Sequence, residues 1–500
     1  MEKLRVDTKR SGVKLKPYWK KLITAGRAKE GLFADWRDQL AEVQREIGFE
    51  YIRFHGIFHD DMMIYREVSG VPVFNFHYLD SLIDFLLSIE MRPFLELGFM
   101  PFDLRSGEET CFWWKGGITP PKSLEKWALL VEETVNHCIL RYGLEEVRKW
   151  YFEVWNEPNL REYFWAGDMQ DYFELYRTTA KVLKKIDPEL RVGGPATSNF
   201  THGKAPWVEE FLYFCSSEGL PMDFISSHPY PNAWPIGDDG NRVLVYRDKW
   251  STADDLKWLK AASERYGFGD AEIHATEWNS SFLPWDLVHD TQFMATFIVH
   301  NMIAAIGTAN SLGFWTFTDI FEEVQIPGEL FHGGFGLINQ IGLKKPSYNA
   351  FLLLSRLGEQ LVDGGEDYIV TKSGETVQVM LWNYCHYDEG FANGDRSKLS
   401  STARYDIFQE KEREVEIEVE LDSGSYRVIE TYLTRENSVF DLWLQRGQSD
   451  YLFSIDKEEL IRDSEPSSHE SEFSGSILTK RLLLKPHTVC MIEIERTTQE

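Results

Sequence analysis

Trp150-Tyr-Phe-Glu-Val-Trp-Asn-Glu-Pro-Asn159 is the stretch from which the rest of the chain can be interpreted. Its first six residues are aromatic or apolar except for Glu153, a pattern typical of a buried strand. Pro158 has no backbone N–H and Asn159 favours turns, so strand pairing is expected to stop there. The stretch therefore predicts that Glu157 lies at the C-terminal end of a strand. In a (β/α)8 barrel that end carries the catalytic groups, whereas the opposite end serves stability.

On both sides of this stretch, strand patterns alternate with amphipathic helix patterns. The expected strands are 22–26, 51–55, 92–97, 150–155, 191–194, 223–228, 272–277 and 311–317. The expected helices are 35–47, 78–89, 124–142, 170–186, 207–217, 253–266, 291–306 and 347–357. Right-handed βαβ connections place the helices outside, so the pattern predicts an α/β fold with a closed parallel (β/α)8 (TIM) barrel.

The pattern changes near residue 360. Period-2 runs without intervening helices follow, which predicts an antiparallel β-sandwich, and the run 414–421 alternates carboxylate and aliphatic side chains as a strand with one wet side does. Residues 456–474 are charged and serine-rich, and are expected to form a helix followed by a loose loop. We therefore expect three parts, namely an N-terminal strand that joins the sandwich, the catalytic barrel, and the sandwich domain, with limits at 1–14, 15–358 and 359–500.

The amino-acid composition restricts the classes of binding partner and the cellular compartment that are expected. A formal charge of −27 and a pI near 5.0 argue against nucleic acid or an anionic membrane, because phosphate binding needs clusters of Lys and Arg. Five scattered cysteines without a CxxC pair indicate free thiols in a reducing compartment. No apolar leader and no membrane-spanning stretch is present, so a cytoplasmic location is expected. No phosphate-binding loop or metal-ligand spacing was found, so neither a cofactor nor a metal is expected.

A second stretch, Glu272-Ile-His-Ala-Thr-Glu-Trp-Asn279, has the same design and ends near Glu277. One glutamate at a strand end is usually a surface residue, but two, each beside aromatic residues and asparagine, indicate a shared pocket. Two carboxylates facing one pocket are the minimum equipment for hydrolysing a glycosidic bond. With retention of configuration they lie about 5–5.5 Å apart, and the negative charge of one helps to keep the other protonated.

Several motifs carry a family resemblance. They are Trp155-Asn-Glu-Pro-Asn159, Thr276-Glu-Trp-Asn279, Phe331-His-Gly-Gly-Phe-Gly336, Phe54-His-Gly56, Pro93-Phe-Leu-Glu-Leu-Gly-Phe-Met-Pro101 and Val192-Gly-Gly-Pro195. Over roughly residues 22–357 the chain resembles glycoside hydrolase family 39, the bacterial β-xylosidases, although Asn-Glu-Pro alone is shared by a whole clan of barrels. The resemblance implies a retaining mechanism with Glu157 as acid/base and Glu277 as nucleophile, a C-terminal β-sandwich, and a homotetramer. The family usually has Tyr at Trp278 and Ala at Pro229, which leaves the fine specificity open.

The resemblance also implies roles for residues on the second and fourth strands. Asn156 is similar to the clan's donor to the sugar 2-hydroxyl, and a turn-forming asparagine is the alternative. Arg53 is expected to hold Glu277 ionised, or to form a buried structural ion pair, or both. His55 is expected either to bind a sugar hydroxyl or to serve the structure.

Six further residues belong to the predicted binding site. His228 and Tyr230 close the sixth strand, where the clan places a hydroxyl donor to the nucleophile, although the loop can also hold them for packing. Trp315 matches the aromatic floor under the sugar, which in the clan is followed by a cis peptide bond. Glu323 resembles a ligand of distal sugar hydroxyls, with an exposed loop residue as the alternative, and Trp113 and Trp114 are expected to wall the cleft.

Together these features predict an exo-acting β-D-xylosidase that takes xylo-oligosaccharides from their non-reducing ends. Within the family, the alternatives are another β-glycosidase, an arabinopyranosidase or an α-L-iduronidase-like enzyme. The last would need Arg or Lys near the sugar carboxylate, and the loops after the sixth and eighth strands offer little of either. A catalytically silent carbohydrate-binding protein would lack one of the carboxylates, and both are present. The expected partner is a small sugar, with no nucleic acid and no membrane.

Overall fold

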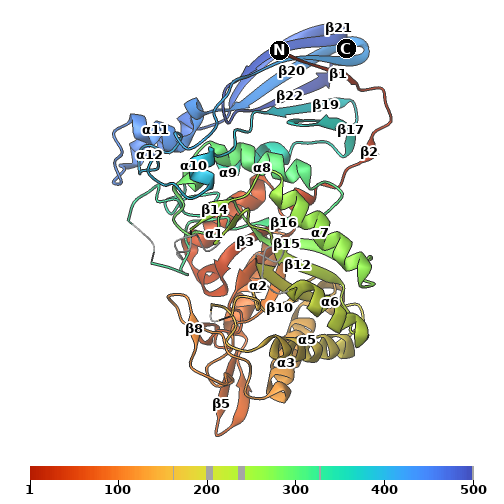
Figure 1. The fold of residues 1–500 in the computed structure, drawn as a ribbon, viewed down its shortest axis with the longest axis vertical. Coiled ribbons are helices and arrows are strands. Elements are labelled where there is room, and N and C mark those ends of the chain that lie inside the picture. Colours follow the sequence, from red (N-terminus) through yellow and green to blue (C-terminus); the bar gives the residue numbers. More distant parts are fainter. Residues whose placement is uncertain (162, 199–205, 235–242, 326–327, 498–500) are drawn as a thin grey trace.

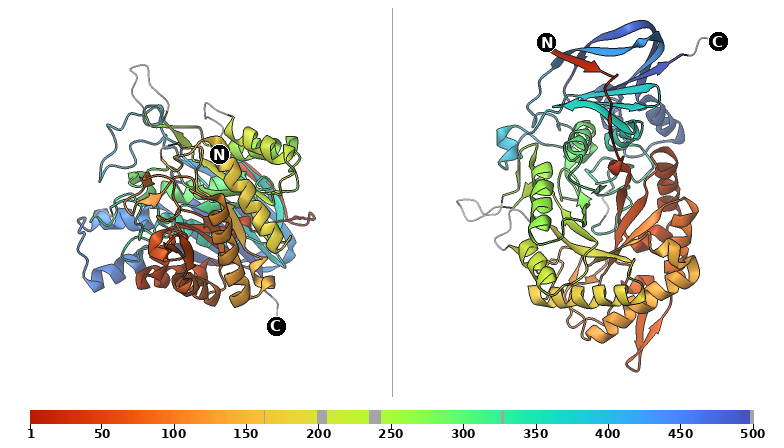
Figure 2. Two further views of the ribbon diagram at one scale, coloured as in Figure 1. Left: turned by 90° about the horizontal axis from the view of Figure 1, so that it is seen from below. Right: turned by 90° about the vertical axis from the view of Figure 1, so that its right-hand side faces the viewer.

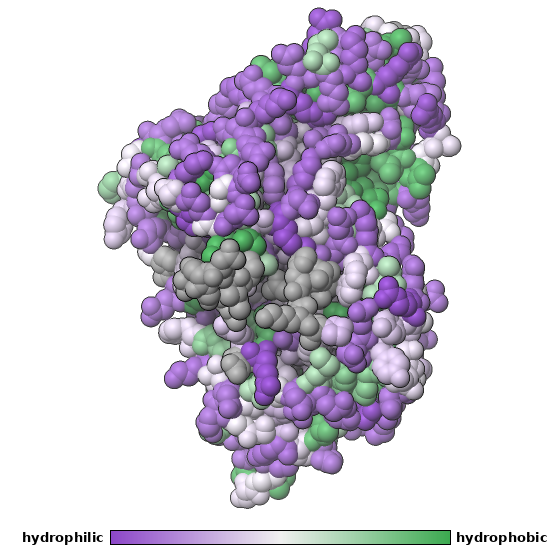
Figure 3. Space-filling view, viewed as in Figure 1, coloured by the Kyte–Doolittle hydropathy of each residue, from purple (hydrophilic) through white to green (hydrophobic). Residues whose placement is uncertain are grey.

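A computed structural model describes residues 1–161, 163–198, 206–234, 243–325 and 328–497. The chain forms an elongated molecule in which a barrel with its helices is followed by a smaller domain rich in strands (Figure 1). The face seen in Figure 3 is largely polar, and its hydrophobic side chains gather in small groups. Across the described ranges, none of the helices has the length and hydropathy needed to cross a membrane.

Eight parallel strands close into a barrel in the order β3-β4-β7-β10-β11-β12-β15-β16, which confirms the predicted (β/α)8 architecture. Their bounds are β3 Leu22–Arg27, β4 Tyr51–His55, β7 Arg92–Leu97, β10 Tyr151–Val154, β11 Arg191–Ser198, β12 Phe224–His228, β15 Glu272–Trp278 and β16 Ser311–Phe314. Every strand lies within a few residues of its prediction. Continuous apolar runs explain this agreement, because barrel strands are buried on both faces.

The barrel is surrounded by helices (Figure 2), which lie in the predicted positions apart from one additional short helix at 144–147. They are α1 Ala34–Glu46, α2 His77–Ser88, α3 Leu124–Tyr142, α4 Leu144–Val147, α5 Met169–Ile186, α6 Trp207–Ser217, α7 Ser251–Arg265, α8 Phe293–Ala304 and α9 Pro346–Leu354. The ends of α5 illustrate why the boundaries could be predicted. Asp168 caps the N-terminus of the helix, since its side chain accepts from the Asp171 N–H in a capping box, and Asp187, just before a proline, caps the C-terminus.

Aromatic side chains close the N-terminal end of the barrel. Tyr51, Phe94, Tyr151 and Phe224 form one cluster there, and the Phe94 and Tyr151 rings stack with centroids 4.7 Å apart. Because side chains alternate along a strand, the residue two positions further on points into the barrel again. On β4 that residue is Arg53, so a charged layer lies directly above the aromatic one. The closed base leaves the opposite, C-terminal mouth as the accessible end.

Short elements extend from the barrel loops. The paired strands are β5 Tyr65–Val68 with β6 Val71–Phe74, β8 Thr110–Cys111 with β9 Gly116–Gly117, and β13 Asn232–Ala233 with β14 Val245–Tyr246. The short 3-10 helices of the barrel part are η1 Tyr18–Lys20, η2 Ala28–Leu32, η3 Asp60–Met62 and η4 Leu287–Asp290. A fifth, η5 Arg435–Asn437, lies in the C-terminal part.

The C-terminal part is an eight-stranded sheet of order β1-β20-β22-β19-β18-β17-β2, with β21 also paired to β20. The strands are β1 Glu2–Asp7, β2 Val13–Lys14, β17 Gln360–Gly365, β18 Tyr368–Ser373, β19 Thr376–Trp382, β20 Arg413–Leu433, β21 Ser467–Leu484 and β22 Val489–Arg496. β20, β21 and β1 lie above β19 and β17 (Figure 1), and side chains of β19 and β20 share one apolar core. The domain predicted as an antiparallel β-sandwich is therefore confirmed as mainly antiparallel and rich in strands, with all its strands joined in one sheet.

The N-terminus takes part in this sheet. β1 pairs in parallel with β20, from Glu2 opposite Val415 to Asp7 opposite Glu420, and β2 pairs with β17. The segment then runs down to the barrel, as the red trace in Figure 2 shows. The domain limits near residues 14 and 358 stay a prediction.

One prediction for this domain is wrong. Residues 456–474 were expected to form a helix followed by a loose loop, and the helix α12 is present at Ser454–Asp463. The remainder, however, begins β21, which pairs with β20 from Leu484 opposite Arg413 to Ser467 opposite Tyr432. Most side chains in the first half of β21 are exposed on both faces, so the sequence shows no period-2 signal there. The pairing with β20 supplies the structure that the local sequence does not indicate.

Residues 383–412, between β19 and β20, turn back onto the barrel, and we name them the bridging segment. It contains α10 Glu389–Ala392, and its Tyr387, Tyr405 and Phe408 belong to the same apolar cluster as the barrel helices. After β20, the helices α11 Val439–Gln445 and α12 pack against the same side.

Candidate active site

Both predicted acids lie at the C-terminal mouth of the barrel. β10 ends at Val154, and the backbone then turns sharply, with φ of 72° at Trp155 and 43° at Glu157. The Glu157 N–H donates to the carbonyl of Ala196 at 3.0 Å, which fixes the turn against β11. Glu277 is the penultimate residue of β15. Each of the two glutamates is only 5% exposed.

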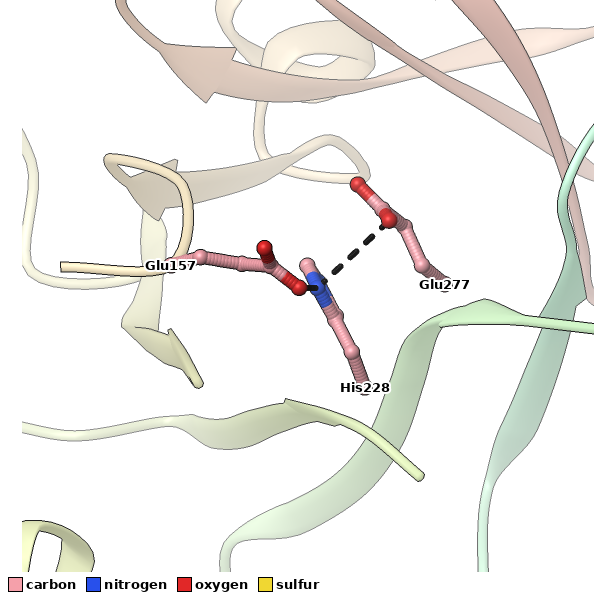
Figure 4. A group of neighbouring side chains, drawn as sticks. All are labelled: Glu157, His228 and Glu277. Carbon is pink, nitrogen blue, oxygen red and sulfur yellow. Dashed lines mark hydrogen bonds and ion pairs between the residues drawn. The ribbon is translucent and has the colours of Figure 1, made fainter. Parts of the chain in front are cut away.

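The two carboxyls face each other across the mouth, with His228 between them (Figure 4). His228 Nδ1 lies 2.7 Å from Glu157 Oε1 and 3.6 Å from Glu277 Oε2. One oxygen of each carboxyl and a His228 nitrogen all lie within 4.8 Å of one another. The closest oxygens of the two carboxyls are therefore no more than 4.8 Å apart, which is compatible with the roughly 5–5.5 Å separation of retaining carboxyl pairs.

Arg53 organises the layer below the acids. Its fully buried guanidinium donates to Glu277 Oε1 at 2.8 Å, to Glu153 Oε2 at 2.5 Å and to Asn156 Oδ1 at 2.8 Å. Glu96 Oε2 lies 3.0 Å from the same guanidinium. Arg53 therefore contacts Glu277 directly and also belongs to a buried ion-pair network, while its role in holding Glu277 ionised stays a prediction.

The environments of the two acids differ in charge. Burial raises the pKa of Glu157 well above its usual value, and the negative charge of Glu277 raises it further. Burial also raises the pKa of Glu277, but Arg53 and a hydrogen bond from Tyr230 limit that rise. The pair is therefore expected to share one proton, which resides on Glu157.

His228 and Tyr230 come from the end of β12 and the loop after it. Burial lowers the pKa of His228 well below its usual value, and the positive charge of Arg53 lowers it further, so the imidazole is neutral. Its Nε2 lies 3.2 Å from Thr276 Oγ1. The Tyr230 hydroxyl donates to Glu277 Oε2 at 3.0 Å. Burial raises the pKa of Tyr230 well above its usual value, so the phenol keeps its proton as a donor.

On the other side of Glu277, His55 connects three carboxylates. Its Nδ1 contacts Glu96, and its Nε2 lies 3.3 Å from both Glu277 Oε1 and Glu323 Oε1. Glu323 is 8% exposed, so the structure does not support the alternative of an exposed loop residue. Burial raises the pKa of Glu323 well above its usual value, as does the negative charge of Glu277.

Trp315 lies just beyond the end of β16, and the peptide bond after it is cis. Its ring centroid is 4.9 Å from that of His55 and 6.0 Å from that of Phe321. The ring therefore lies beside the acids, where a floor for a sugar ring is expected. It does not lie in the helix layer.

A pocket of about 810 Å³ opens next to these groups. Glu323 and Trp113 both line it, together with aromatic side chains from three loops. Trp113 is 59% exposed, and its backbone N–H donates to the Glu323 carbonyl at 2.9 Å. It therefore lies at the outer edge of the pocket, whereas Trp114 is buried behind it.

The structure shows two site residues that the sequence analysis missed. Glu96 on β7 and Glu153 on β10 are fully buried beside Arg53. One oxygen of each has no hydrogen-bond partner among the described residues. A single acidic residue inside an otherwise apolar strand was the available signal, because a buried charge needs a charged or polar partner. Trp278, in contrast, lies outside the pocket and stacks on Phe297 of α8 at 5.1 Å, so this departure from the family changes the packing behind Glu277.

Among the described residues, Glu157, His228 and Glu277 are the group whose atoms are close enough to hold a metal ion. The donor set does not favour a resident ion, because each member already has partners in the protein. Glu277 accepts from Arg53 and Tyr230, and His228 contacts both Glu157 and Thr276. The absence of a metal and of any other cofactor stays a prediction.

Comparisons with known proteins agree with this geometry. The chain is 39% identical to a β-xylosidase of Caldicellulosiruptor saccharolyticus over 96% of each chain, and 40% identical to one of Geobacillus stearothermophilus over 74% of each chain. The crystal structure of a monomeric β-xylosidase from Caulobacter crescentus matches with a TM-score of 0.90 and 30% identity, covering 100% of both chains. The model of glycosyl hydrolases family 39 matches residues 2–475. With its barrel, its paired carboxyls and this match, the chain belongs to glycosyl hydrolases family 39 and is a glycoside hydrolase.

Proposed function

We propose that the protein is a retaining, exo-acting β-D-xylosidase that releases xylose from the non-reducing ends of xylo-oligosaccharides. One observation carries this proposal: two buried carboxyls face each other at the barrel mouth, and only one of them contacts a buried arginine. The β-xylosidase relatives support the choice of sugar. Both carboxyls are present, with the shared proton expected on Glu157 and the negative charge on Glu277. A catalytically silent binding protein is therefore not supported.

In the proposed mechanism, Glu277 attacks the anomeric carbon and forms a covalent glycosyl-enzyme. Glu157 gives its proton to the departing glycosidic oxygen, so the aglycone leaves as a neutral alcohol. Glu157, now ionised, then takes a proton from water, and the water oxygen attacks the anomeric carbon and displaces Glu277. Because Glu277 is restored as a carboxylate beside Arg53, the charge pattern of the resting site returns.

The neighbouring side chains have the orientations that sugar recognition needs. Arg53 donates to Asn156 Oδ1, so the amide nitrogen of Asn156 is left to donate to the sugar 2-hydroxyl. The Glu323 carboxylate lines the pocket beside His55, where a sugar hydroxyl can donate to it. Trp315 provides an apolar face near His55. We assign these residues to the subsite for the sugar that is released.

The charge of the pocket supports a neutral sugar over a uronic acid. Of the residues that the structure describes, those lining the pocket include no Lys or Arg. Glu323 adds a carboxyl group, which is either ionised or protonated. Arg53 is already occupied by Glu277, Glu153 and Asn156. A sugar carboxylate would therefore lack a cationic partner, which argues against the iduronidase-like alternative.

Two alanine variants test the roles of the acids. Glu277→Ala cannot form the glycosyl-enzyme, so its activity should collapse on every substrate, including dinitrophenyl β-xyloside. Azide can then attack in the vacated space and give an α-glycosyl azide. Glu157→Ala loses only proton transfer, an effect of about 10²–10⁴-fold on substrates that need it. It should still cleave dinitrophenyl β-xyloside, accumulate the covalent intermediate, and give the β-glycosyl azide.

Product configuration decides between the outcomes, and NMR of the azide products measures it. Swapped configurations would mean that the roles of Glu157 and Glu277 are reversed. Near-normal activity of both variants on xylobiose would place the reaction elsewhere. A panel of aryl glycosides with the unaltered protein tests the sugar, because an enzyme for arabinopyranose, galactose or glucose would prefer those members.

For the surroundings of the enzyme, we propose the cytoplasm, in line with five cysteines that form no disulfide. A homotetramer is implied by family resemblance alone, and one similar structure is described as monomeric, so the assembly stays a prediction.

A further inference from the structure

The opening of the active-site pocket is surrounded by large exposed aromatic side chains. Trp113, Tyr163 and Trp285 all line the pocket and are 59%, 63% and 48% exposed. They belong to three different loops, which follow β8, β10 and β15. Exposed aromatic groups that meet around one opening usually mark a binding surface, because burying them in the protein would otherwise be favourable.

The aromatic side chains lie on the leaving-group side of the site. The inner end of the pocket is at Glu323, whose carboxylate contacts His55 beside Glu277. In an exo-acting enzyme the closed end holds the sugar that is released, so the leaving group extends toward the opening. Tyr163 also lies on the loop that follows Glu157, the proposed proton donor to the leaving group.

The chemistry of the opening favours an apolar leaving group. Besides the three exposed rings, the pocket is lined by the apolar groups of Phe112, Phe164 and Val324. Thr110 and Gln325 add polar side chains, and Glu323 at the inner end is the single charged residue among the described lining residues. A second xylose unit can stack its C–H face on these rings, but it finds few hydrogen-bond partners for its hydroxyls. A hydrocarbon chain or ring needs only apolar contact.

We propose that Trp113, Tyr163 and Trp285 form an aglycone subsite for β-xylosides whose leaving group is an alkyl or aryl alcohol. The inference rests on the proposed function, since it concerns the partner group of the same glycosidic bond. The bond that breaks and the water that is consumed are the same as in the hydrolysis of an oligosaccharide. The subsite contributes binding energy through its contacts with the alkyl or aryl group, which takes no part in the bond breaking.

A series of alkyl β-D-xylosides tests the subsite. Methyl, butyl and hexyl alcohols are nearly equal in basicity, so the chemistry stays constant while the apolar surface grows. Each CH2 that leaves water should raise kcat/KM by up to about fourfold. Since the exposed subsite covers only part of the chain, we expect hexyl xyloside to exceed methyl xyloside roughly tenfold. Xylobiose is measured beside them as the sugar alternative.

The variants Trp285→Ala and Tyr163→Ala should reduce the hexyl-to-methyl ratio toward one. Using a ratio keeps the result interpretable if a variant loses activity on all substrates. Tyr213→Ala is the matched control, because Tyr213 is 61% exposed on α6 and does not line the pocket, and its ratio should equal that of the unaltered protein.

Two results would overturn the subsite. One is a flat alkyl series in the unaltered protein. The other is a loss on xylobiose alone in both variants, which would make the rings a platform for a second sugar. If methyl xyloside and xylobiose are both inert, the choice of xylose has failed instead. The alkyl series is then made with the sugar that the enzyme does cleave, and the same ratio decides the subsite.

Discussion

At the residue scale, the site depends on how one buried cation is shared. Arg53 contacts Glu96, Glu153 and Glu277, so the layer holds more negative than positive charge, and further donors are needed to keep Glu277 ionised. Tyr230 is such a donor, and it comes from the opposite side of the carboxyl. In the described part of the chain Glu157 contacts no cation, because its partner His228 is a neutral imidazole, so Glu157 keeps its proton.

Tyr230→Phe tests this division of charge. Without the hydroxyl, the pKa of Glu277 rises, because a hydrogen bond to the charged form is lost. Glu277 must be ionised to act as nucleophile, so activity is lost as pH falls through its pKa. The acidic limb of the kcat/KM profile should therefore move up by about 1–2 pH units, the equivalent of a hydrogen bond to a charged group. The alkaline limb, set by deprotonation of Glu157, should move less.

The control is Tyr246→Phe. Tyr246 is also buried and donates to a carboxylate, but that carboxylate is Asp286 and not Glu277. Its acidic limb should stay in place. An unchanged acidic limb in Tyr230→Phe, or an equal shift in both variants, would contradict the assignment.

Much of the site could be predicted at this scale, and the misses have a common cause. Glu157 lies just past the end of a strand and Glu277 lies at the end of another, so a local sequence pattern indicates both of them. Glu96 and Glu153 lie inside such strands, and their meaning depends on Arg53, which is more than 40 positions away in the sequence from either. Only the closed barrel brings the three side chains together. Similarly, the sequence did not show that His228 stands between the acids.

At the scale of elements, the loop after β16 separates two adjacent acids. Glu323 turns inward to His55, whereas Glu322 turns outward to Arg27 at the end of β3. The Glu322 N–H donates to buried Glu30 at 2.7 Å, so the backbone is held as well as the side chain. Arg27 also contacts Asp61, and its guanidinium carbon lies 5.1 Å from the centre of the Trp114 ring.

Arg27 is not expected to contact the sugar, but Arg27→Met should still weaken sugar binding through the loop after β16. The substitution removes the ion pair that holds the loop, so Glu323 becomes less well placed. KM for xylosides should rise about tenfold while kcat changes less, because the lost interaction stabilises the ground state and the transition state alike. Steady-state kinetics on one aryl xyloside measures the split. Arg92→Met is the control, because Arg92 forms a similar pair with Glu146 at 2.7 Å but lies at the start of β7, at the base of the barrel.

Both variants should lose stability, and only Arg27→Met should raise KM. Equal KM values in the two variants would mean that the loop is held by other contacts. Arg27→Lys adds a rescue test, since lysine keeps a charge near Glu322 and should restore part of the affinity.

The elements also show where sequence patterns end. All eight barrel strands were predicted because burial on both faces gives continuous apolar runs. β21 was missed because its exposed first half has no such run, and its partner β20 decides its conformation. The hairpin β8–β9 was also not predicted, since two-residue strands carry no periodic signal.

At the scale of the whole molecule, the barrel and the strand-rich domain share a core. The main apolar cluster includes barrel helices, the bridging segment and the inner residues of β19 and β22, such as Trp382 and Met491. A second cluster belongs to the sheet alone. Because the main cluster runs through the junction, we expect the two parts to unfold together, although the sequence predicted separate domains.

A buried charge cluster lies at the same junction. Arg404 of the bridging segment is 1% exposed and donates to Asp290 Oδ2 at 2.8 Å and to the Leu287 and Phe331 carbonyls. Lys345, fully buried, contacts Asp290 Oδ1 at 2.8 Å and Asp319 Oδ2 at 2.9 Å. Burial alone would raise the pKa of Asp290, but Lys345 and Arg404 hold it at about 2, so the carboxylate stays ionised.

Arg404→Met should therefore destabilise the whole molecule and not only one part. Removing one partner of a buried ion pair costs about 3–5 kcal/mol, because the remaining charge and carbonyls lose their donors. In differential scanning calorimetry we expect a single transition that moves down by several degrees. Arg356→Met is the matched control, since Arg356 also reaches across the junction, to Glu493 at 3.6 Å, but its side chain is 37% exposed. Such a pair contributes about 0–1 kcal/mol, so this transition should hardly move. Two resolved transitions in Arg404→Met would show that the barrel and the sheet unfold independently, and that the shared apolar cluster does not couple them.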